Sequence, residues 1–450
     1  MSPFGFTPDN NDEENPKPDD FAAMMRQMQE QIQKQFQELG INPAGFINPF
    51  ANFAPGGKGQ QEALPIATVR DTAKKFAQAQ GSQPLGTKDV TVVNNALEIA
   101  ELWLNEATVF PATAIGAAHT SLSRLDWVDE TLPGWQATME PLATGLATAI
   151  SSLLDQAVAG QGEGDGQEDA VAALAGSMGA IAGLLRSFIG SMIATQLGQA
   201  IGAISANATG AHDVALPLLD PARPILIPEN IEKWSADLEI PKTEVYLFHA
   251  LREAAIARLF AHNSWIVSYM RSAIVDYGRG IRIDMEAIQR QAEEAMQNFD
   301  PSQINPESGE NSFNIALNNG IFTPEETPEQ RAALSKLETA LALVDGWADD
   351  VTTLAAGDRL PAITQLREMY RRQRATNAPA QQLFKSLLGL EVSPKLTREA
   401  SAFWQKVRES KDVASRDALW SGILPNADEL LDPVAFLSST QVPDDLSGLL

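Results

Sequence analysis

Residues 243–265 read TEVYLFHALREAAIARLFAHNSW, and we expect this stretch to decide the fold. Its apolar residues recur every three or four positions, which is the spacing of one buried helix face. The positions that set this period are Phe248, Leu251, Ala255 and Leu259. The spacing predicts a helix over residues 243–270. Because ionisable side chains interrupt the apolar run, the same helix holds the candidate chemistry of the chain.

Composition restricts the class of protein. The chain has 450 residues, of which 44% are hydrophobic, enough for a sizeable core. It carries 58 acidic against 33 basic side chains, a net charge of -25 that repels phosphate backbones. We therefore expect no nucleic-acid partner. The absence of cysteine excludes disulfides and every thiolate-ligated metal, so any metal must bind His and carboxylate.

The pattern along the chain predicts a mainly α-helical protein with a small β element at Ile225–Ile227, where neighbouring prolines exclude a helix. The expected parts are an acidic tail at 1–66 with an amphipathic helix at 20–39, a helical region at 67–297, a loop at 298–330, a C-terminal helical half at 331–425 and an acidic tail at 426–450.

No segment resembles a secretory leader, so we expect a cytoplasmic protein. The apolar stretch Val171–Ile204 has Arg186 in its middle and is rich in Gly and Ala. This composition favours close packing of soluble helices over a membrane span.

The segment at 243–265 and the preceding LPLLDPARPILIPENIEKW, residues 216–234, resemble an actinobacterial zincin-like family described as zinc-dependent metalloproteases or hydrolases. The resemblance continues through LALVDGWADDVT at 341–352, RRQRATNAPAQQLFKSLLGLEVSP at 371–394 and RDALW at 416–420. It implies a zincin-like metallopeptidase scaffold, with helical N- and C-terminal halves flanking a cleft.

The resemblance also identifies where zinc ligands are missing. Zincins bind zinc through His-Glu-x-x-His on a helix, where the glutamate activates the bound water. The matching residues here are Arg252, Glu253, Ala254, Ala255 and Ile256. The presumed general base, Glu253, is present, but a guanidinium and an alkyl chain replace both histidines. We therefore expect no cofactor, and zinc only if the protein is an active enzyme.

A second signature of some relatives, Glu-Gly-His-Ala-Asp, reads Asp345, Gly346, Trp347, Ala348 and Asp349. A third expected imidazole is thus replaced by Trp347. The side chains left as candidate metal ligands are His249, His262, Asp345 and Asp349. For both histidines, ordinary local hydrogen bonds are the favoured interpretation.

Several ionisable groups are expected to have structural roles. We expect Glu253 to form an ion pair with Arg252, Arg258 or Arg371, because a carboxylate kept in a cleft without zinc needs a cation. The basic run Arg371–Arg374 is expected to pair with the chain's own carboxylates, with anion binding as the alternative. His212, beside Asp213, is expected to make only a loop contact.

Three functional hypotheses follow. In the first, the scaffold has lost peptidase activity and binds a peptide or protein in the old cleft. In the second, it is a working hydrolase with Glu253 as base and non-standard ligands. In the third, it is a regulatory protein that acts through the Met-rich helix at 20–39.

Overall fold

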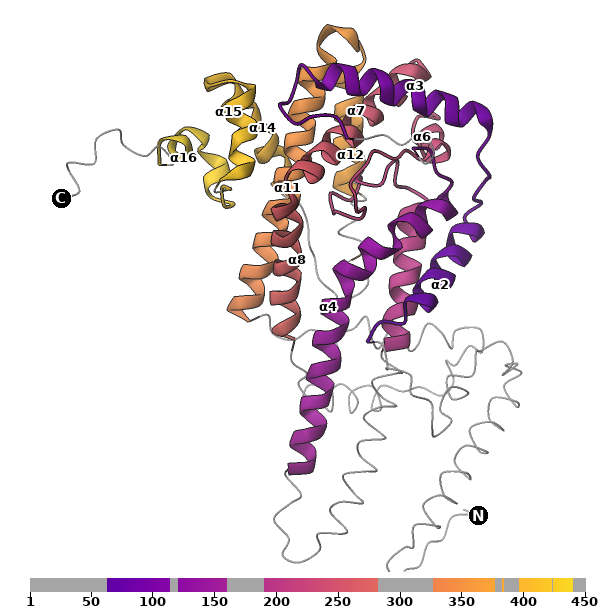
Figure 1. Ribbon diagram of the computed structural model, residues 1–450, viewed down its shortest axis with the longest axis vertical. Helices are drawn as coiled ribbons and strands as arrows, with labels where there is room; N and C mark the ends of the chain where they lie inside the picture. Colours follow the sequence, from indigo (N-terminus) through magenta and orange to yellow (C-terminus); the bar gives the residue numbers. More distant parts are fainter. Residues whose placement is uncertain are drawn as a thin grey trace, which may run out of the picture. The chain divides into compact units, whose positions relative to one another are not determined.

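Helix α7, Lys242–His262, is the central helix of the fold (Figure 1). Its neighbours are α3 (Thr87–Leu104), α8 (Ser264–Arg279) and α11 (Pro328–Ala356), with α6 (Pro228–Trp234) and α12 (Ile363–Thr376) packed at its N-terminal half. The mainly α-helical fold expected from the sequence is confirmed.

The computed structural model describes residues 63–113, 120–159, 190–281, 327–376, 383, 396–422 and 424–439. The remaining helices in these ranges are α2 (Ile66–Ala79), α4 (Arg124–Ala159), α14 (Thr397–Ser410), α15 (Val413–Ala418) and α16 (Pro433–Ser439), with short 3-10 turns η3 (Gly357–Arg359), η4 (Leu419–Ser421) and η5 (Glu429–Leu431). Residues 190–205 are also helical. The expected helix at 20–39, most of the 298–330 loop and the end of the C-terminal tail lie outside the described residues.

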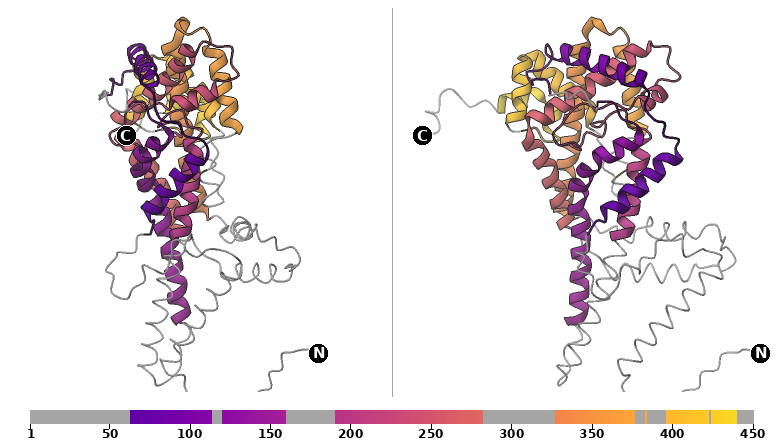
Figure 2. Two further views of the ribbon diagram at one scale, coloured as in Figure 1. Left: turned by 90° about the vertical axis from the view of Figure 1, so that its right-hand side faces the viewer. Right: turned by 45° about the vertical axis from the view of Figure 1, so that its right-hand side comes forward.

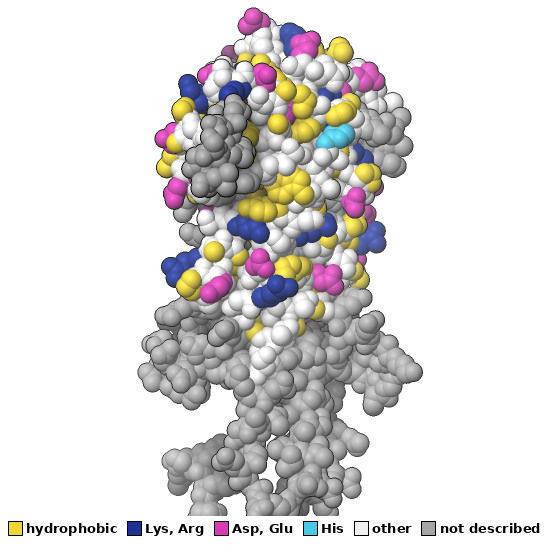
Figure 3. Space-filling view, turned by 60° about the vertical axis from the view of Figure 1, so that its left-hand side comes forward, with side chains coloured by type: hydrophobic (Ala, Val, Ile, Leu, Met, Phe, Trp, Pro, Cys, Tyr) yellow, Lys and Arg dark blue, Asp and Glu magenta, His cyan; other side chains and the backbone are white. Residues whose placement is uncertain are grey.

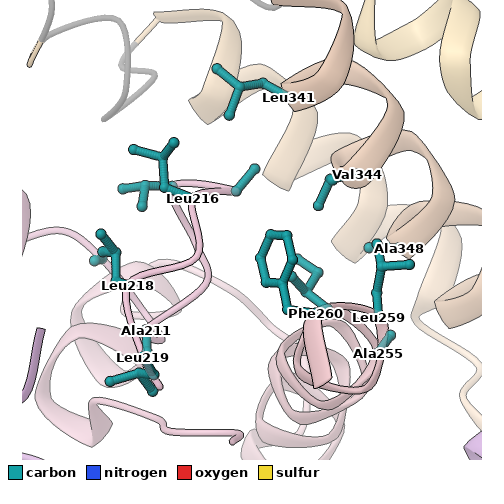
Figure 4. Close-up of a cluster of buried hydrophobic side chains, with 14 of the residues drawn as sticks. Ala211, Leu216, Leu218, Leu219, Ala255, Leu259, Phe260, Leu341, Val344 and Ala348 are labelled. Atoms are coloured by element: carbon teal, nitrogen blue, oxygen red, sulfur yellow. The ribbon is translucent and has the colours of Figure 1, made fainter. Parts of the chain in front are cut away.

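Helix α7 is buried on all sides. Every residue from Val245 to Phe260 except Leu247 is buried. The expectation of a single buried face was too narrow, because helices surround α7 and leave it no solvent-facing side. In the cluster of Figure 4, Phe260 of α7 lies between Leu216, in the loop that precedes α6, and Val344 of α11.

The helix expected over 243–270 is two helices. Asn263 separates α7 from α8 with non-helical backbone angles, φ -131° and ψ 62°. Its backbone N–H and its side-chain amide both donate to the Leu259 carbonyl, each at 3.0 Å. An asparagine in this role satisfies a carbonyl at the helix end and lets the chain change direction.

Helix α11 packs against α7. It begins with a capping box, in which the Thr327 hydroxyl accepts a hydrogen bond from the Gln330 N–H at 3.2 Å and the Gln330 side-chain oxygen accepts one from the Thr327 N–H at 3.1 Å. On its far side α11 packs closely on α14, because Gly346 has no side chain. A Cβ built there would lie 2.7 Å from the Ala400 Cβ.

Helix α4 is the longest helix described. It contains Pro133 and Pro141 and runs with α2 on one side and α8 on the other (Figures 1 and 2). Gly145 of α4 meets Gly278 of α8, where an added Cβ would lie 2.8 Å from the Gly278 carbonyl carbon. These contacts join the N-terminal helices to the layer that holds α7.

The small β element is reduced to single bridges. Leu226 pairs with Ser121 in a parallel bridge and with Gly210 in an antiparallel one. No strand forms in the described ranges, because each pairing extends over only one residue. The bridges nevertheless fix the loop at 206–227 against the N-terminal half of the chain.

Within the described ranges, no helix combines the length and the hydropathy of a membrane span. On the face shown in Figure 3, acidic and basic side chains are interspersed with apolar ones. The large negative charge is therefore not gathered into one patch on that face.

Candidate functional site

Arg252, which the resemblance aligns with the first zinc ligand, contacts α11. Its guanidinium forms a salt bridge with Asp345, lies 3.8 Å from Asp349 and stacks 4.1 Å from the centre of the Tyr370 ring. Burial alone lowers the pKa of Arg252, but Tyr370, Asp345 and Asp349 together raise it above its usual value. A permanent cation thus occupies a position that holds an imidazole in zincins.

A second guanidinium lies near Tyr370. The Arg374 side chain is 5.3 Å from the centre of that ring and 3.6 Å from both Asp213 and Asp345. The Tyr370 hydroxyl donates to Asp213 at 2.7 Å. Burial raises the pKa of Asp213, but Arg374, the Thr209 N–H and the Tyr370 hydroxyl outweigh it, so the net shift is downward.

Asp349 is held by cations from α12. Arg367 and Arg371 donate to it at 2.7 and 2.6 Å, and the Ser401 hydroxyl of α14 donates at 2.6 Å. Burial raises the pKa of Asp349, but the Arg367 hydrogen bond and the charges of the arginines lower it well below the usual range. The carboxylate is therefore ionised and fully engaged.

Charges in this cluster balance. The positive groups are Arg252, Arg367, Arg371 and Arg374, and the negative groups are Asp213, Asp345, Asp349 and the adjacent Glu253. The four cations contact the three aspartates, and Glu253 supplies the fourth negative charge. Buried charges are tolerated only when they are paired or hydrogen-bonded.

Glu253 does not form the expected ion pair with an arginine. Among the described residues Arg252 and Arg371 contact the aspartates above, and Arg258 donates to Glu101 of α3 at 2.7 Å. Instead, Glu253 accepts hydrogen bonds from the backbone N–H groups of Ala211, His212 and Ile225 at 3.0–3.3 Å. The backbone of the loop satisfies the carboxylate, so no arginine is required.

The imidazole partner of Glu253 is His212, whose Nδ1 lies 2.8 Å from Oε1 of the carboxylate. His212 is fully buried. Its contact is with Glu253, 41 residues away in the sequence, and not only with the neighbouring Asp213 as expected. Gly210 leaves the room that Glu253 needs, because a Cβ there would lie 2.7 Å from the carboxylate carbon.

Little space remains at the motif. The gap bordered by Ile256, Arg252 and Glu253 has a volume of about 10 Å³, roughly the room one water needs. His249 lines the same gap, and its Nε2 has no hydrogen-bond partner among the residues that the structure describes. Burial, together with the charge of Arg252, lowers the pKa of His249 to about 4 despite the opposing effect of Asp213.

Trp347 lies away from this cluster. It is two residues from Asp345 on α11, which places it on nearly the opposite face of the helix. Its indole N–H donates to Asp417 at 2.9 Å, and its ring packs edge-on against Trp420 at 6.3 Å. The residues of the second signature that face the motif helix are thus Asp345 and Asp349.

His262 does not join the other candidate ligands. It lies at the C-terminal end of α7, about 15 Å along the helix axis from Arg252 at 1.5 Å per residue. Its exposed ring contacts the Pro111 carbonyl at 3.1 Å and stacks on Phe110. The predicted ligand set therefore divides, with His249, Asp345 and Asp349 near the motif and His262 apart from it.

The donor atoms at the motif do not fit a zinc ion. A guanidinium has no lone pair to donate, and Ile256 has no polar atom. In the part of the chain that the structure describes, no three His, Asp or Glu side chains have a metal-binding arrangement. Arg252 and Ile256 therefore offer no ligand atoms at the positions where the resemblance expects histidines.

Comparison with known proteins identifies the scaffold. The family model described as zincin-like metallopeptidase matches residues 66–437, and the chain belongs to this family. The crystal structure of a proposed hydrolase with a novel fold from Chloroflexus aurantiacus aligns with a TM-score of 0.55 and 16% identity, over 84% of this chain and 100% of that one. That likeness shows a shared fold. No protein with a curated description matches.

Sequence reasoning missed four members of the cluster. Asp213 and His212 come from the loop before α6, and Arg367 and Tyr370 come from α12. Nothing in their local sequence relates them to the cluster, since their partners are 18 to 157 residues away. The signal that was present is Tyr370 next to the basic run at 371–374.

Proposed function

We propose that this protein is a non-catalytic member of the zincin-like metallopeptidase family and acts by binding a peptide or a protein segment. The observation that supports this most directly is the salt bridge between Arg252, at the first ligand position, and Asp345. The guanidinium neutralises the buried Asp345 carboxylate, which a metal ion would otherwise have to do.

Charge balance gives a second reason. A zinc ion near Arg252 would add two positive charges to a cluster whose four arginines already balance the charges of three aspartates and Glu253. It would also have to enter a gap of about 10 Å³ that the Arg252 side chain lines. Desolvating an uncompensated charge in such a site is strongly unfavourable.

The bonding of Glu253 also favours a structural role. A general base needs a free lone pair directed at the water that it activates. Here the two oxygens accept hydrogen bonds from three backbone N–H groups and approach His212. The carboxylate connects α7 to the loop at 211–225, and this connection supports the fold.

The alternative is an active hydrolase with Glu253 as base and His249, Asp345 or Asp349 as unusual ligands. It is supported by membership of a peptidase family and by His249, which lines the gap and whose Nε2 has no partner within the described ranges. Replacing Glu253 cannot separate the two functions, because a Gln amide placed against the N–H groups of Ala211 and Ile225 would itself disturb the fold.

The zinc content of the purified protein distinguishes the non-catalytic role from the active hydrolase. The protein is purified without a polyhistidine tag, and its zinc is measured by elemental mass spectrometry alongside a fluorescent casein digestion assay. We expect well below one zinc per chain and no digestion. The double variant Arg252→His/Ile256→His is the matched control, since it restores two imidazoles at the spacing that chelates zinc. About one zinc per wild-type chain would contradict the proposal.

A further inference from the structure

A groove lies beside the closed motif, between α12 and α6. It has a volume of about 770 Å³, which is within the range of sites that bind ligands. One wall is a single face of α12 that includes Gln365, Met369 and Arg372, at spacings of four and three residues. The other wall comes from α6 and the loop before it, with Asn207, Lys233 and Trp234. We call it the α6–α12 groove.

The apolar part of the groove is Trp234 with Met369. Both side chains are half-buried. The Trp234 ring is fixed from behind, because it stacks on Phe248 at 6.3 Å and meets the edge of His249 at 4.7 Å. A fixed aromatic ring beside a flexible thioether is a surface that accepts one bulky apolar side chain.

The polar part of the groove matches a peptide backbone. Asn207 and Gln365 are exposed at its rim, and a carboxamide offers both donors and an acceptor. An extended peptide presents the same two kinds of group along its length. The pairing of carboxamides with an apolar floor is therefore suited to a peptide segment.

The charge of the groove has the opposite sign to that of the chain. Among the described lining residues Arg372 pairs with the one acid, Glu368, at 2.8 Å, which leaves the charge of Lys233, whereas the whole chain carries -25. Within the described residues the Lys233 ammonium makes only two contacts, both at 3.4 Å, to the Ala206 carbonyl and the Asn207 amide oxygen. A lysine without a carboxylate in so acidic a protein favours an anionic ligand.

We propose that the α6–α12 groove binds an extended acidic peptide segment of a partner protein, with an apolar side chain against Trp234 and Met369 and a carboxylate at Lys233. This extends the proposed function and rests on it for the role of peptide binding. It places the ligand beside the motif instead of at Arg252. The two sites adjoin, since Trp234 contacts His249 and Met369 precedes Tyr370 in α12.

The probe is a pair of fluorescent twelve-residue peptide pools. Each pool has one Leu, Phe or Trp at the centre, flanked by Asp, Ser and Gly in one pool and by Lys, Ser and Gly in the other. Binding to the full-length protein is measured by fluorescence anisotropy. We expect the acidic pool to bind and the basic pool not to bind. Failure of the acidic pool, or equal binding of both pools, would overturn the proposal.

Variants locate the binding. Lys233→Glu and Met369→Glu should each weaken binding of the acidic pool about tenfold or more, as expected for central contacts. Lys406→Glu, an exposed charge reversal on α14, is the matched control and should have little effect. Circular dichroism verifies that each variant is folded. Equal affinities for the Lys233 and Lys406 variants would overturn the assignment to this groove.

The non-catalytic role and the peptide site in the α6–α12 groove can be refuted independently. Zinc in the wild-type protein, with casein digestion, would refute the non-catalytic role even if Lys233→Glu still abolished peptide binding. Metal-free protein that ignores both peptide pools would leave the non-catalytic role and refute the groove.

Discussion

Replacing Arg252 with Met tests whether its guanidinium holds α7 and α11 together. The substitution keeps most of the side-chain volume but removes the cation that pairs with Asp345, a residue only 5% exposed. Removing one partner of a buried pair costs about 3–5 kcal/mol. Because Arg374 still lies 3.6 Å from Asp345, we expect the lower end of that range, about 3 kcal/mol.

The assay is equilibrium unfolding in urea, followed by tryptophan fluorescence. The matched control is Arg279→Met on α8, whose exposed pair with Asp276 at 3.5 Å should contribute less than about 1 kcal/mol. The double variant Arg252→Met/Asp345→Asn should be less destabilised than the sum of the single variants, by about 1 kcal/mol or more. A loss under about 1 kcal/mol for Arg252→Met, or strict additivity, would refute a metal-like role for the guanidinium.

Three further predictions concern the same region. The pKa of His249 is about 4 in the fold and about 6.5 when unfolded, so the unfolded chain binds the extra proton and stability falls as pH drops from 6.5 to 4, by up to about 3 kcal/mol. His249→Phe should flatten urea midpoints over this window, and an unchanged slope would contradict the assignment. Gly210→Ala should destabilise the fold by about 2 kcal/mol or more, because the new Cβ meets Glu253, whereas Gly422→Ala, with its nearest atom at 3.9 Å, should change thermal unfolding little. Gly346→Ala should cost about 1–3 kcal/mol through the contact with α14, and a melting temperature equal to that of the Gly422 variant would argue against this close packing.

The sequence was sufficient for the family and for the helical class. Periodicity located α7 to within a residue at its N-terminus, and the segments of resemblance identified the zincin-like scaffold that the family match confirms. The end of α7 was missed, because the Asn263 break depends on one residue whose side chain bonds back to Leu259. Full burial of α7 was missed too, because periodicity reports one face and not what packs on the others.

The candidate site was predictable only in part. The sequence is enough to align Arg252 and Ile256 with the zinc ligands of the family it resembles, and to note the acids at Asp345 and Asp349. The partners of Glu253 do not follow, because backbone N–H groups of a distant loop have no sequence signature. Charge pairing alone suggested an arginine, and the loop satisfied the carboxylate instead.

The network around Arg252 makes a metal-binding arrangement unreachable by one substitution. A single change to His at position 252 would leave Asp345 facing a side chain that is mostly uncharged at neutral pH. A single change at Ile256 would bury an imidazole beside a guanidinium. Each intermediate is destabilised before any zinc affinity can compensate, since one imidazole binds zinc weakly. Under the proposed function, the salt bridge thus separates this chain from a metal-binding protein by at least two substitutions.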